Sequence, residues 1–186
     1  MRLTLVCSLS TSALRTATFP GDEPIDSQSE AGASGLVPRL GRIDRAWTSP
    51  ALRARQTAAA LGLAVTVEAA LRDCAYGRWA GRRLVDIQIE EPEAVAAWTT
   101  DPTAVPHGGE PVLDVLSRVA RWLDDRAGET GHSVAVTHPA VIRAAIIHAI
   151  RATPQSFWRI DVPPLSLTDL RQHQGRWTLR STGCFQ

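Results

Sequence analysis

The chain has 186 residues, a length typical of one domain with a substantial core. Its 20 basic and 19 acidic residues give a formal net charge of +1, which argues against a nucleic-acid or membrane-surface partner recruited by bulk charge. No apolar run approaches the ~20 residues of a membrane span, and the apolar run at the N-terminus is too short for a signal peptide. We therefore expect a single domain over residues 1–186 with no membrane partner.

The cysteines and histidines give no sign of a metal centre. Cys7, Cys74 and Cys184 form no CxxC pair, so neither a disulfide framework nor a zinc site is indicated, and a reducing cytoplasm is the expected location. The five histidines lack the spacing of metal ligands. We expect no metal and no other cofactor.

The first half of the chain alternates short apolar runs with helical patterns. The run Arg2–Cys7 predicts a strand buried on both faces. A polar loop of unusual length follows, up to Gln28, and such long loops are often functional. After it we expect a short helix, a strand, a helix and a strand, over Ser29–Leu40, Arg45–Ser49, Ala51–Leu61 and Val65–Glu68.

The middle of the chain is predicted to be helical between two loops. The loops are Leu71–Gly81 and Asp101–Glu110, and between them lie two short helical patterns, Leu84–Glu90 and Pro92–Thr99. The clearest amphipathic helix follows at Pro111–Ala127, because its apolar residues share one face.

A strand, a tight turn and a helix are predicted between residues 133 and 150. The apolar run Val134–Val136 ends at Thr137-His138, and Pro139 is favoured as the first residue of a helix. His138 is therefore expected at a helix N-cap, just past the carboxyl end of a strand, where open α/β sheets bind ligands. The positive end of the helix dipole there attracts anions and disfavours a protonated imidazole.

The C-terminal part predicts a short helix at Thr153–Trp158 and a hairpin. The hairpin strands are Ser166–Leu170 and Arg176–Arg180, joined by a turn at Gln174-Gly175. Because strands and helices alternate along the chain, we predict a three-layer α/β/α sandwich with a largely parallel central sheet.

Four segments of the sequence carry a family resemblance. SPALRARQTA, LRDCAYGRWAG, PHGGEP and VAVTHPAVIRA occur in this order. Together they resemble the histidine phosphatase superfamily, whose fold is phosphoglycerate-mutase-like, and the likeness runs from Arg2 to about Leu179. The resemblance implies that Ser49 and Arg53 form the motif that places an arginine on phosphate. It also implies a role for the residues that follow: Asp73 matches the general acid, which is usually Glu, His138 matches the second active-site histidine, and Gly108, Gly109 and Glu110 match a turn near the pocket.

The first motif of that family is missing. Members begin with a strand that ends in Arg-His-Gly, whose histidine accepts the phosphoryl group. Here Cys7 stands in place of the arginine and Ser8 in place of the nucleophile, and the first histidine in the chain is His107. Pro139 also replaces the glycine that usually follows the second histidine. Loss of a nucleophile alone costs roughly 10⁶ in turnover in a well-studied hydrolase, so phosphohistidine chemistry is not expected here.

Three hypotheses for the function follow. The first, slightly favoured, is a repurposed enzyme, a hydrolase, lyase or isomerase. It would use Ser8 and His138 as nucleophile and base, or His138 and Asp73 as base and acid while Arg53 holds an anionic group. The second is a catalytically inactive pseudophosphatase that acts as a binding or partner domain. The third is a residual phosphatase in which His138 itself accepts phosphate.

The predicted ligand is a small anionic metabolite, and phosphorylated metabolites belong to this class. Its expected contacts are Arg53, Arg15, Ser49, Cys7, Glu110 and His107. Arg15 would replace the missing arginine, although a solvated surface position is the more frequent case for such a residue. For Arg143 a surface ion pair on its helix is favoured over a place in the pocket, and for Glu23 the pocket mouth and a solvated turn are equally good alternatives. A homodimer is the default expectation for the oligomeric state.

Overall fold

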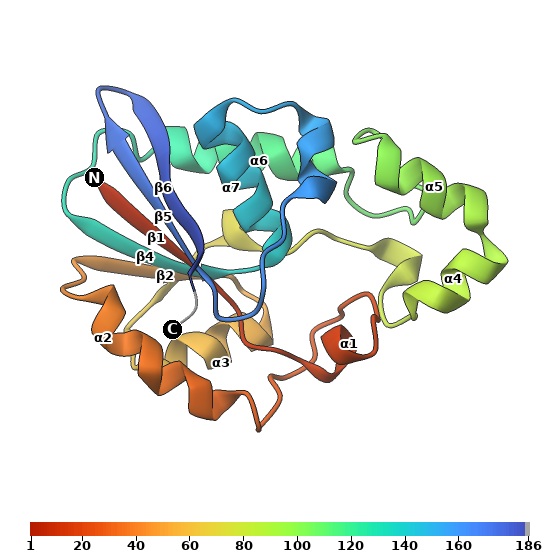
Figure 1. Cartoon of the computed structure of the whole chain (residues 1–186), viewed down its shortest axis with the longest axis horizontal. Coiled ribbons are helices and arrows are strands. Elements are labelled where there is room, and N and C mark those ends of the chain that lie inside the picture. The colour runs from red at the N-terminus through yellow and green to blue at the C-terminus, as the bar shows by residue number, and fades with distance from the viewer. Residues whose placement is uncertain (185–186) are drawn as a thin grey trace.

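The computed structural model describes residues 1–184 and is built on a six-stranded sheet (Figure 1). The strand order is β3-β2-β4-β1-β5-β6; β1, β2, β3 and β4 are mutually parallel, whereas β5 pairs antiparallel with both β1 and β6. The strands are β1 (Arg2–Cys7), β2 (Arg45–Thr48), β3 (Thr66–Val67), β4 (His132–Thr137), β5 (Leu167–His173) and β6 (Arg176–Cys184). A largely parallel sheet is therefore confirmed.

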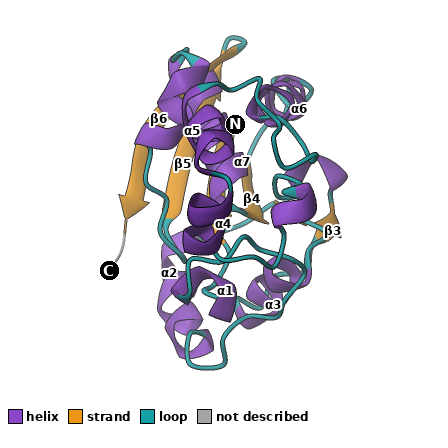
Figure 2. Cartoon of the chain, turned by 90° about the vertical axis from the view of Figure 1, so that its right-hand side faces the viewer, coloured by secondary structure: helices purple, strands orange, loops and turns teal. Residues whose placement is uncertain are grey.

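Helices cover both faces of this sheet (Figures 1 and 2). One face packs against α6 (Val112–Asp124) and α7 (Pro139–Ile150), and the other packs against α3 (Leu52–Ala60) and α2 (Val37–Leu40). Alternate residues of each strand serve the two cores, since Leu5 of β1 belongs to the first cluster and Val6 to the second. The predicted three-layer sandwich is confirmed.

The strand, turn and helix around His138 form as expected. All six residues of β4 are buried, as a central parallel strand requires. His138 has extended backbone angles, φ −121° and ψ 159°, and caps α7, whose first residue is Pro139. The helix ends at Arg151, which adopts a left-handed conformation with φ 54°.

Two short helices form a separate projection beside the sheet (Figure 1). They are α4 (Leu84–Glu90) and α5 (Pro92–Thr100), which enclose a small core of Phe19, Trp79, Ile87 and Val95. Arg78 pairs with Glu91, and Arg82 pairs with Glu90, which fastens this projection to the 77–82 loop. The aromatic core holds the loop that carries Tyr76 close to the sheet.

The structure corrects several predicted boundaries. The long loop after β1 contains a short helix, α1 (Ser12–Arg15), and the expected helix at residues 29–40 is a 3₁₀ helix, η1 (Glu30–Leu36), followed by α2. Gly32 and Gly35 explain that difference, because glycine weakens a regular α-helix. Three further 3₁₀ helices lie in predicted loop or helix segments: η2 (Ala69–Leu71), η3 (Gly77–Trp79) and η4 (Pro154–Arg159).

The C-terminal hairpin forms with the predicted turn. Gln174 and Gly175 have φ values of 50° and 73°, the left-handed pair that a tight hairpin turn requires. Its second strand continues past Arg180 to Cys184. Among residues 1–184, none of the helices has the length and apolar character needed to cross a membrane.

Candidate functional site

A pocket of about 410 Å³ lies beyond the carboxyl ends of β1 and β4. The chain leaves β1 towards the helices of one face and leaves β4 into α7 on the other face, so this is a switch point of the sheet, where α/β proteins bind ligands. Its polar lining comes from well-separated segments: Cys7, Ser8, Glu23, Arg53, Asp73, Tyr76, Arg143 and Asp161.

Arg53 sits at the start of α3 with its guanidinium held by the chain itself. It is only 5% exposed, yet it lines the pocket. Nη2 donates to Asp73 Oδ2 at 2.6 Å, and Nη1 donates to the carbonyl oxygen of Gly21 at 2.7 Å. Glu23 Oε1 lies 3.9 Å from Nη1. The predicted juxtaposition of Arg53 and Asp73 is present, with the arginine already neutralised by a carboxylate.

His138 lies beside Asp73 but is shut off from the pocket. Its side chain is fully buried, Nε2 is 2.7 Å from Ser49 Oγ, and Nδ1 is 3.7 Å from Asp73 Oδ2. Burial lowers the pKa of His138 to about 4, with the Asp73 carboxylate opposing that shift. The imidazole is therefore neutral at pH 7 as predicted, although burial is the main cause and the helix dipole was the predicted one.

The tautomer of His138 follows from its two neighbours. Ser49 Oγ accepts the N–H of Ala51 at 3.2 Å, so its own proton can be donated to Nε2. The Asp73 carboxylate favours the remaining proton on Nδ1, and we assign it there. Within residues 1–184, Nδ1 has no hydrogen-bond partner. The imidazole thus directs an N–H, and not a lone pair, towards Asp73.

Cys7 ends β1, Ser8 follows it directly, and both line the pocket as expected. The backbone N–H of Ser8 donates to the carbonyl oxygen of Thr137 at 2.8 Å, which fixes the residue beside β4. The expected pairing of Ser8 with His138 is not formed, because the imidazole is bonded to Ser49 and its other nitrogen is without a partner in the described chain. Burial raises the pKa of the Cys7 thiol far above its ordinary value, so the residue is a neutral thiol.

Two predicted ligand contacts lie outside the pocket, in the loop packed against it. His107 is buried against the rings of Tyr76 and Trp79, and its Nδ1 accepts the N–H of Gly109 at 3.0 Å. A Cβ on Gly109 would collide with the carbonyl oxygen of Ala75, which explains the glycine there. This part of the prediction is corrected: His107 supports the loop that carries Tyr76.

Glu110 needs the same correction. Its carboxylate accepts hydrogen bonds from Arg118 Nε at 2.8 Å and Nη2 at 3.0 Å, and from Arg72 Nη2 at 2.9 Å. It does not line the pocket. The Gly-Gly-Glu segment therefore supplies a buried ion pair that joins the loop to α6, where the sequence had suggested a substrate contact.

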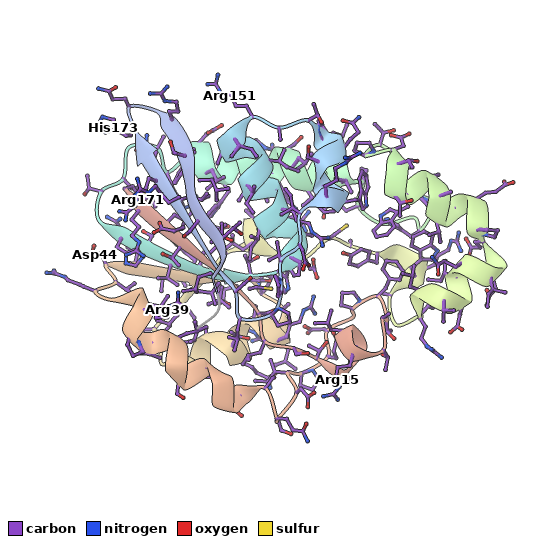
Figure 3. The ribbon with its side chains drawn as sticks, viewed as in Figure 1. Arg15, Arg39, Asp44, Arg151, Arg171 and His173 are labelled. Carbon is purple, nitrogen blue, oxygen red and sulfur yellow. The ribbon has the colours of Figure 1, made fainter. Side chains whose placement is uncertain are left out.

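The arginine that joins Arg53 in the pocket is not the predicted one. Arg15 is exposed, pairs with Asp26 and lies at the surface as the last residue of α1 (Figure 3). Arg143 lines the pocket instead, with Nε donating to the carbonyl oxygen of Ile160 at 2.7 Å and the guanidinium over the ring of Phe157. Both expectations are corrected: Arg15 is the surface residue, and Arg143 belongs to the pocket.

Sequence reasoning also missed Tyr76 and Asp161. Both line the pocket, as does Glu23, for which two positions were open. The position of Asp161 depends on β5 pairing antiparallel to β1, since that pairing puts the chain before Leu167 next to Cys7. A period-two pattern does not reveal which strand it pairs with, so the sequence could not supply this neighbour.

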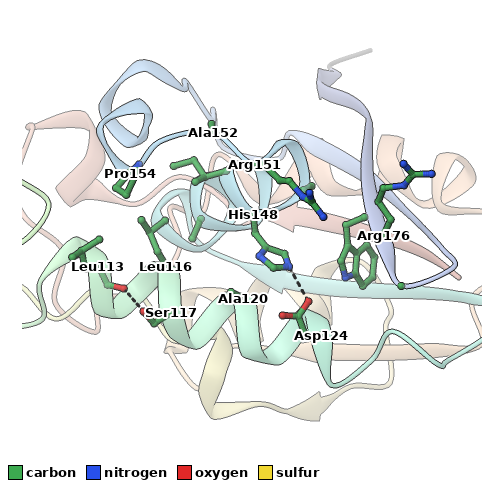
Figure 4. Close-up of a pocket in the computed structure, with 15 residues that line it drawn as sticks. Leu113, Leu116, Ser117, Ala120, Asp124, His148, Arg151, Ala152, Pro154 and Arg176 are labelled. Carbon is green, nitrogen blue, oxygen red and sulfur yellow. Dashed lines mark hydrogen bonds and ion pairs between the residues drawn. The ribbon is translucent and has the colours of Figure 1, made fainter.

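A second, larger cavity of about 640 Å³ lies between α6, α7 and the hairpin (Figure 4). Its wall contains Leu116 and Trp177, and its rim carries a hydrogen bond between His148 Nε2 and Asp124 Oδ1 at 2.9 Å. None of the predicted site residues lines it. In the part of the chain that the structure describes, no group of three or more potential ligand side chains is arranged to hold a metal ion.

The sheet order, the switch-point pocket and the buried histidine beside an arginine–carboxylate pair define an α/β protein of the phosphoglycerate-mutase-like class. The family model described as histidine phosphatase superfamily (branch 1) matches residues 11–184. The chain belongs to the histidine phosphatase superfamily.

Known proteins resemble the chain over most of its length. Bifunctional protein Rv2228c of Mycobacterium tuberculosis is 31% identical over 155 residues, which are 80% of this chain but only 43% of that protein. The solved structure of a mycobacterial glucosyl-3-phosphoglycerate phosphatase with VO3 is 26% identical, with a TM-score of 0.85 and 96% of each chain covered. Alpha-ribazole phosphatase from Shigella flexneri is 25% identical, with a TM-score of 0.86 and coverage of 99% of this chain and 96% of that one.

Proposed function

We propose that this chain binds a small anionic metabolite in the pocket around Arg53 and Arg143 and does not transfer phosphoryl groups through a phosphohistidine. The observation that carries the proposal is the composition of the pocket wall. All five histidines lie within the described residues, and none of them lines the pocket. Without an accessible imidazole, the covalent intermediate of the family has no acceptor.

The internal bonding of the site supports binding over covalent chemistry. Ser49 holds His138 by one nitrogen, and the other carries the assigned N–H that faces Asp73, so Ser8 has no base to activate it. The Cys7 thiol is neutral for the reason given above and is a poor nucleophile in that state. We therefore favour a pseudophosphatase, which was the alternative hypothesis from the sequence.

Two features support an anionic ligand. Arg143 lines the pocket, and its guanidinium forms no ion pair within residues 1–184. Ala140, in the first turn of α7, lines the same pocket, and the N-terminus of a twelve-residue helix favours negative charge. Two of the structural relatives are, by name, phosphatases of small phosphorylated compounds, which supports a phosphorylated ligand.

A combined activity and binding measurement tests this proposal. Phosphate esters of sugars, glycerate and amino alcohols are incubated with the chain, and released phosphate and acid-labile phosphoprotein are measured. We expect neither product, together with a thermal shift by at least one ester that is lost in Arg143→Gln. Acid-labile phosphoprotein that is absent in His138→Ala would contradict the proposal, since it would assign the phosphoryl acceptor to that imidazole.

The short distance between Asp73 and His138 supports a second function, acid–base catalysis without a covalent phosphoenzyme. Asp73 Oδ2 lies 3.7 Å from His138 Nδ1 and also lines the pocket, so a small movement would let the pair share a proton. This proposal expects turnover of a pathway intermediate or a carboxylic ester that is lost in Asp73→Asn. Loss of carboxylic-ester turnover in Ser8→Ala would instead assign the reaction to a serine nucleophile.

A further inference from the structure

The charged residues that line the pocket do not balance. Three carboxylates, from Glu23, Asp73 and Asp161, face two guanidinium groups, from Arg53 and Arg143. Because no histidine lines the pocket, the formal charge of the lining is −1. A pocket built only for a phosphate would carry an excess of positive charge, and this one does not.

Arg53 contributes little free positive charge. Its two terminal nitrogens are bonded to Asp73 Oδ2 and to the carbonyl oxygen of Gly21, and Glu23 Oε1 is within 3.9 Å. Glu23 is itself fixed, since its carboxylate accepts hydrogen bonds from Thr11 Oγ1 at 3.1 Å and from the N–H of Gly21 at 2.8 Å. A ligand anion must compete with these carboxylates for the guanidinium.

Arg143 and Asp161 are the charged lining residues that remain available. Arg143 Nε is bonded to the carbonyl oxygen of Ile160, so the guanidinium lies next to the segment that carries Asp161. Neither side chain forms an ion pair with any residue in the range 1–184, although both line the same pocket. Within residues 1–184, the pocket therefore offers one cation and one anion without an ion pair, on segments joined by the bond from Arg143 to Ile160.

We propose that the pocket selects small molecules that carry a protonated amino group as well as a phosphate or carboxylate. The inference rests on the proposed function, since it specifies the ligand of that same pocket. The anionic group of the ligand contacts Arg143 and the first turn of α7, and the ammonium group contacts Asp161. Such a ligand satisfies both free charges, whereas a simple phosphate ester leaves Asp161 unpaired beside a second negative charge.

Two ligands that differ in one group test the selection. O-phosphoethanolamine and n-propyl phosphate have the same number of heavy atoms, and only the first carries an ammonium group. Calorimetric titration of the full chain at fixed ionic strength is expected to give about twofold to fivefold tighter binding of O-phosphoethanolamine, because Asp161 is exposed and an exposed ion pair contributes at most about 1 kcal/mol. In Asp161→Asn this preference is expected to vanish.

Matched variants separate the two proposals. Asp125→Asn removes the same charge from an exposed position at the C-terminal end of α6 and is expected to keep the preference. Arg143→Gln is expected to weaken both ligands by about tenfold or more, whereas Arg151→Gln, at the exposed end of α7, leaves both unchanged. Equal binding of the two ligands, or tighter n-propyl phosphate, would overturn the selection. If neither ligand binds, or if Arg143→Gln leaves the affinity of both ligands unchanged, the proposed function itself would be overturned.

Discussion

Two buried arginine–carboxylate pairs lie a short distance apart in the fold, and they differ in how completely they are satisfied. Arg118 donates from Nε and Nη2 to the two oxygens of Glu110, and its other contacts are the carbonyl oxygens of Ala70 and Asp73. Arg53 and Asp73 form one short contact, and the neighbouring His138 Nδ1 has no hydrogen-bond partner among the residues that the structure describes. The first pair closes a loop onto a helix, and the second lines a pocket.

The difference shows how a motif residue can belong to the structure and not to the chemistry. A bidentate pair in which all three guanidinium nitrogens are already bonded has little left to offer a ligand. An incompletely bonded pair at a pocket wall has spare donors and acceptors, and unsatisfied polar groups of that kind are typical of functional sites. The predictions below test whether this distinction holds.

The largest effect is expected from breaking the satisfied pair. Arg118→Met leaves the Glu110 carboxylate buried beside only Arg72, and removal of one partner from a buried ion pair costs about 3–5 kcal/mol of unfolding free energy. Urea denaturation followed by circular dichroism measures the change. Arg72→Met is the control, because its side chain is 48% exposed and its loss should cost less than about 1 kcal/mol. Equal costs for the two variants would contradict the assignment of Arg118 as the structural anchor.

The next effect is the pH dependence that His138 contributes to stability. Its pKa is about 4 in the folded chain against an ordinary 6.5, so between these values the unfolded chain binds the extra proton and stability falls as the pH falls. The full contribution is about 3 kcal/mol, and about 2 kcal/mol of it is lost between pH 7.5 and pH 5.

Denaturation of wild type and His138→Gln across that pH range measures this contribution. The other two buried histidines, His107 and His132, also have pKa values lowered by burial, and they contribute equally to both proteins. The slope of stability against pH should therefore be shallower in the variant by the share of His138. Identical slopes would mean that His138 is accessible to water in the folded chain.

A smaller effect is expected at Asp73. Asp73→Asn keeps an acceptor for Arg53 but loses the charge, and a hydrogen bond to a charged group contributes about 1.5–3 kcal/mol, so a loss of about 1–2 kcal/mol is expected. Because the Asp73 carboxylate raises the pKa of His138 against the effect of burial, that pKa should fall further in the variant. An NMR titration of the ring protons measures it, and Asp161→Asn is the control, because it removes the charge of another pocket carboxylate that is not among the main causes of the shift.

The sequence predicts the scaffold of this site better than its ligand contacts. The N-cap position of His138 follows from Pro139 and the apolar run before it, because both constraints are local. Ser49, Arg53 and Asp73 come together as the family resemblance implies. These residues lie at or near the ends of parallel strands, where the alternation of strands and helices already fixes their neighbourhood.

The contacts that the sequence misses depend on distant pairing. Arg143 is one turn into an apolar helix, and nothing in its own segment distinguishes a pocket-lining arginine from a surface one. Asp161 reaches the pocket through the pairing of β5 with β1. The Gly-Gly-Glu motif indicates that the loop lies near the pocket, and this led to the prediction of Glu110 as a ligand contact. Its actual partner is Arg118, eight residues further on and buried on α6, which the motif does not reveal.

The smallest effect is expected at the rim of the larger cavity. His148 Nε2 and Asp124 Oδ1 are 2.9 Å apart, nearly as close as Arg53 and Asp73, but their side chains are 27% and 60% exposed (Figure 4). Water screens such a pair, so Asp124→Asn should change the unfolding free energy by less than about 1 kcal/mol, and added salt should erase even that. A cost as large as that of Asp73→Asn, measured in the same urea series, would contradict this prediction, because it would show that burial does not strengthen the contact between Arg53 and Asp73. A smaller cost for Asp124→Asn than for Asp73→Asn is expected. It would be attributed to solvent exposure, since the two contact distances differ by only about 0.3 Å.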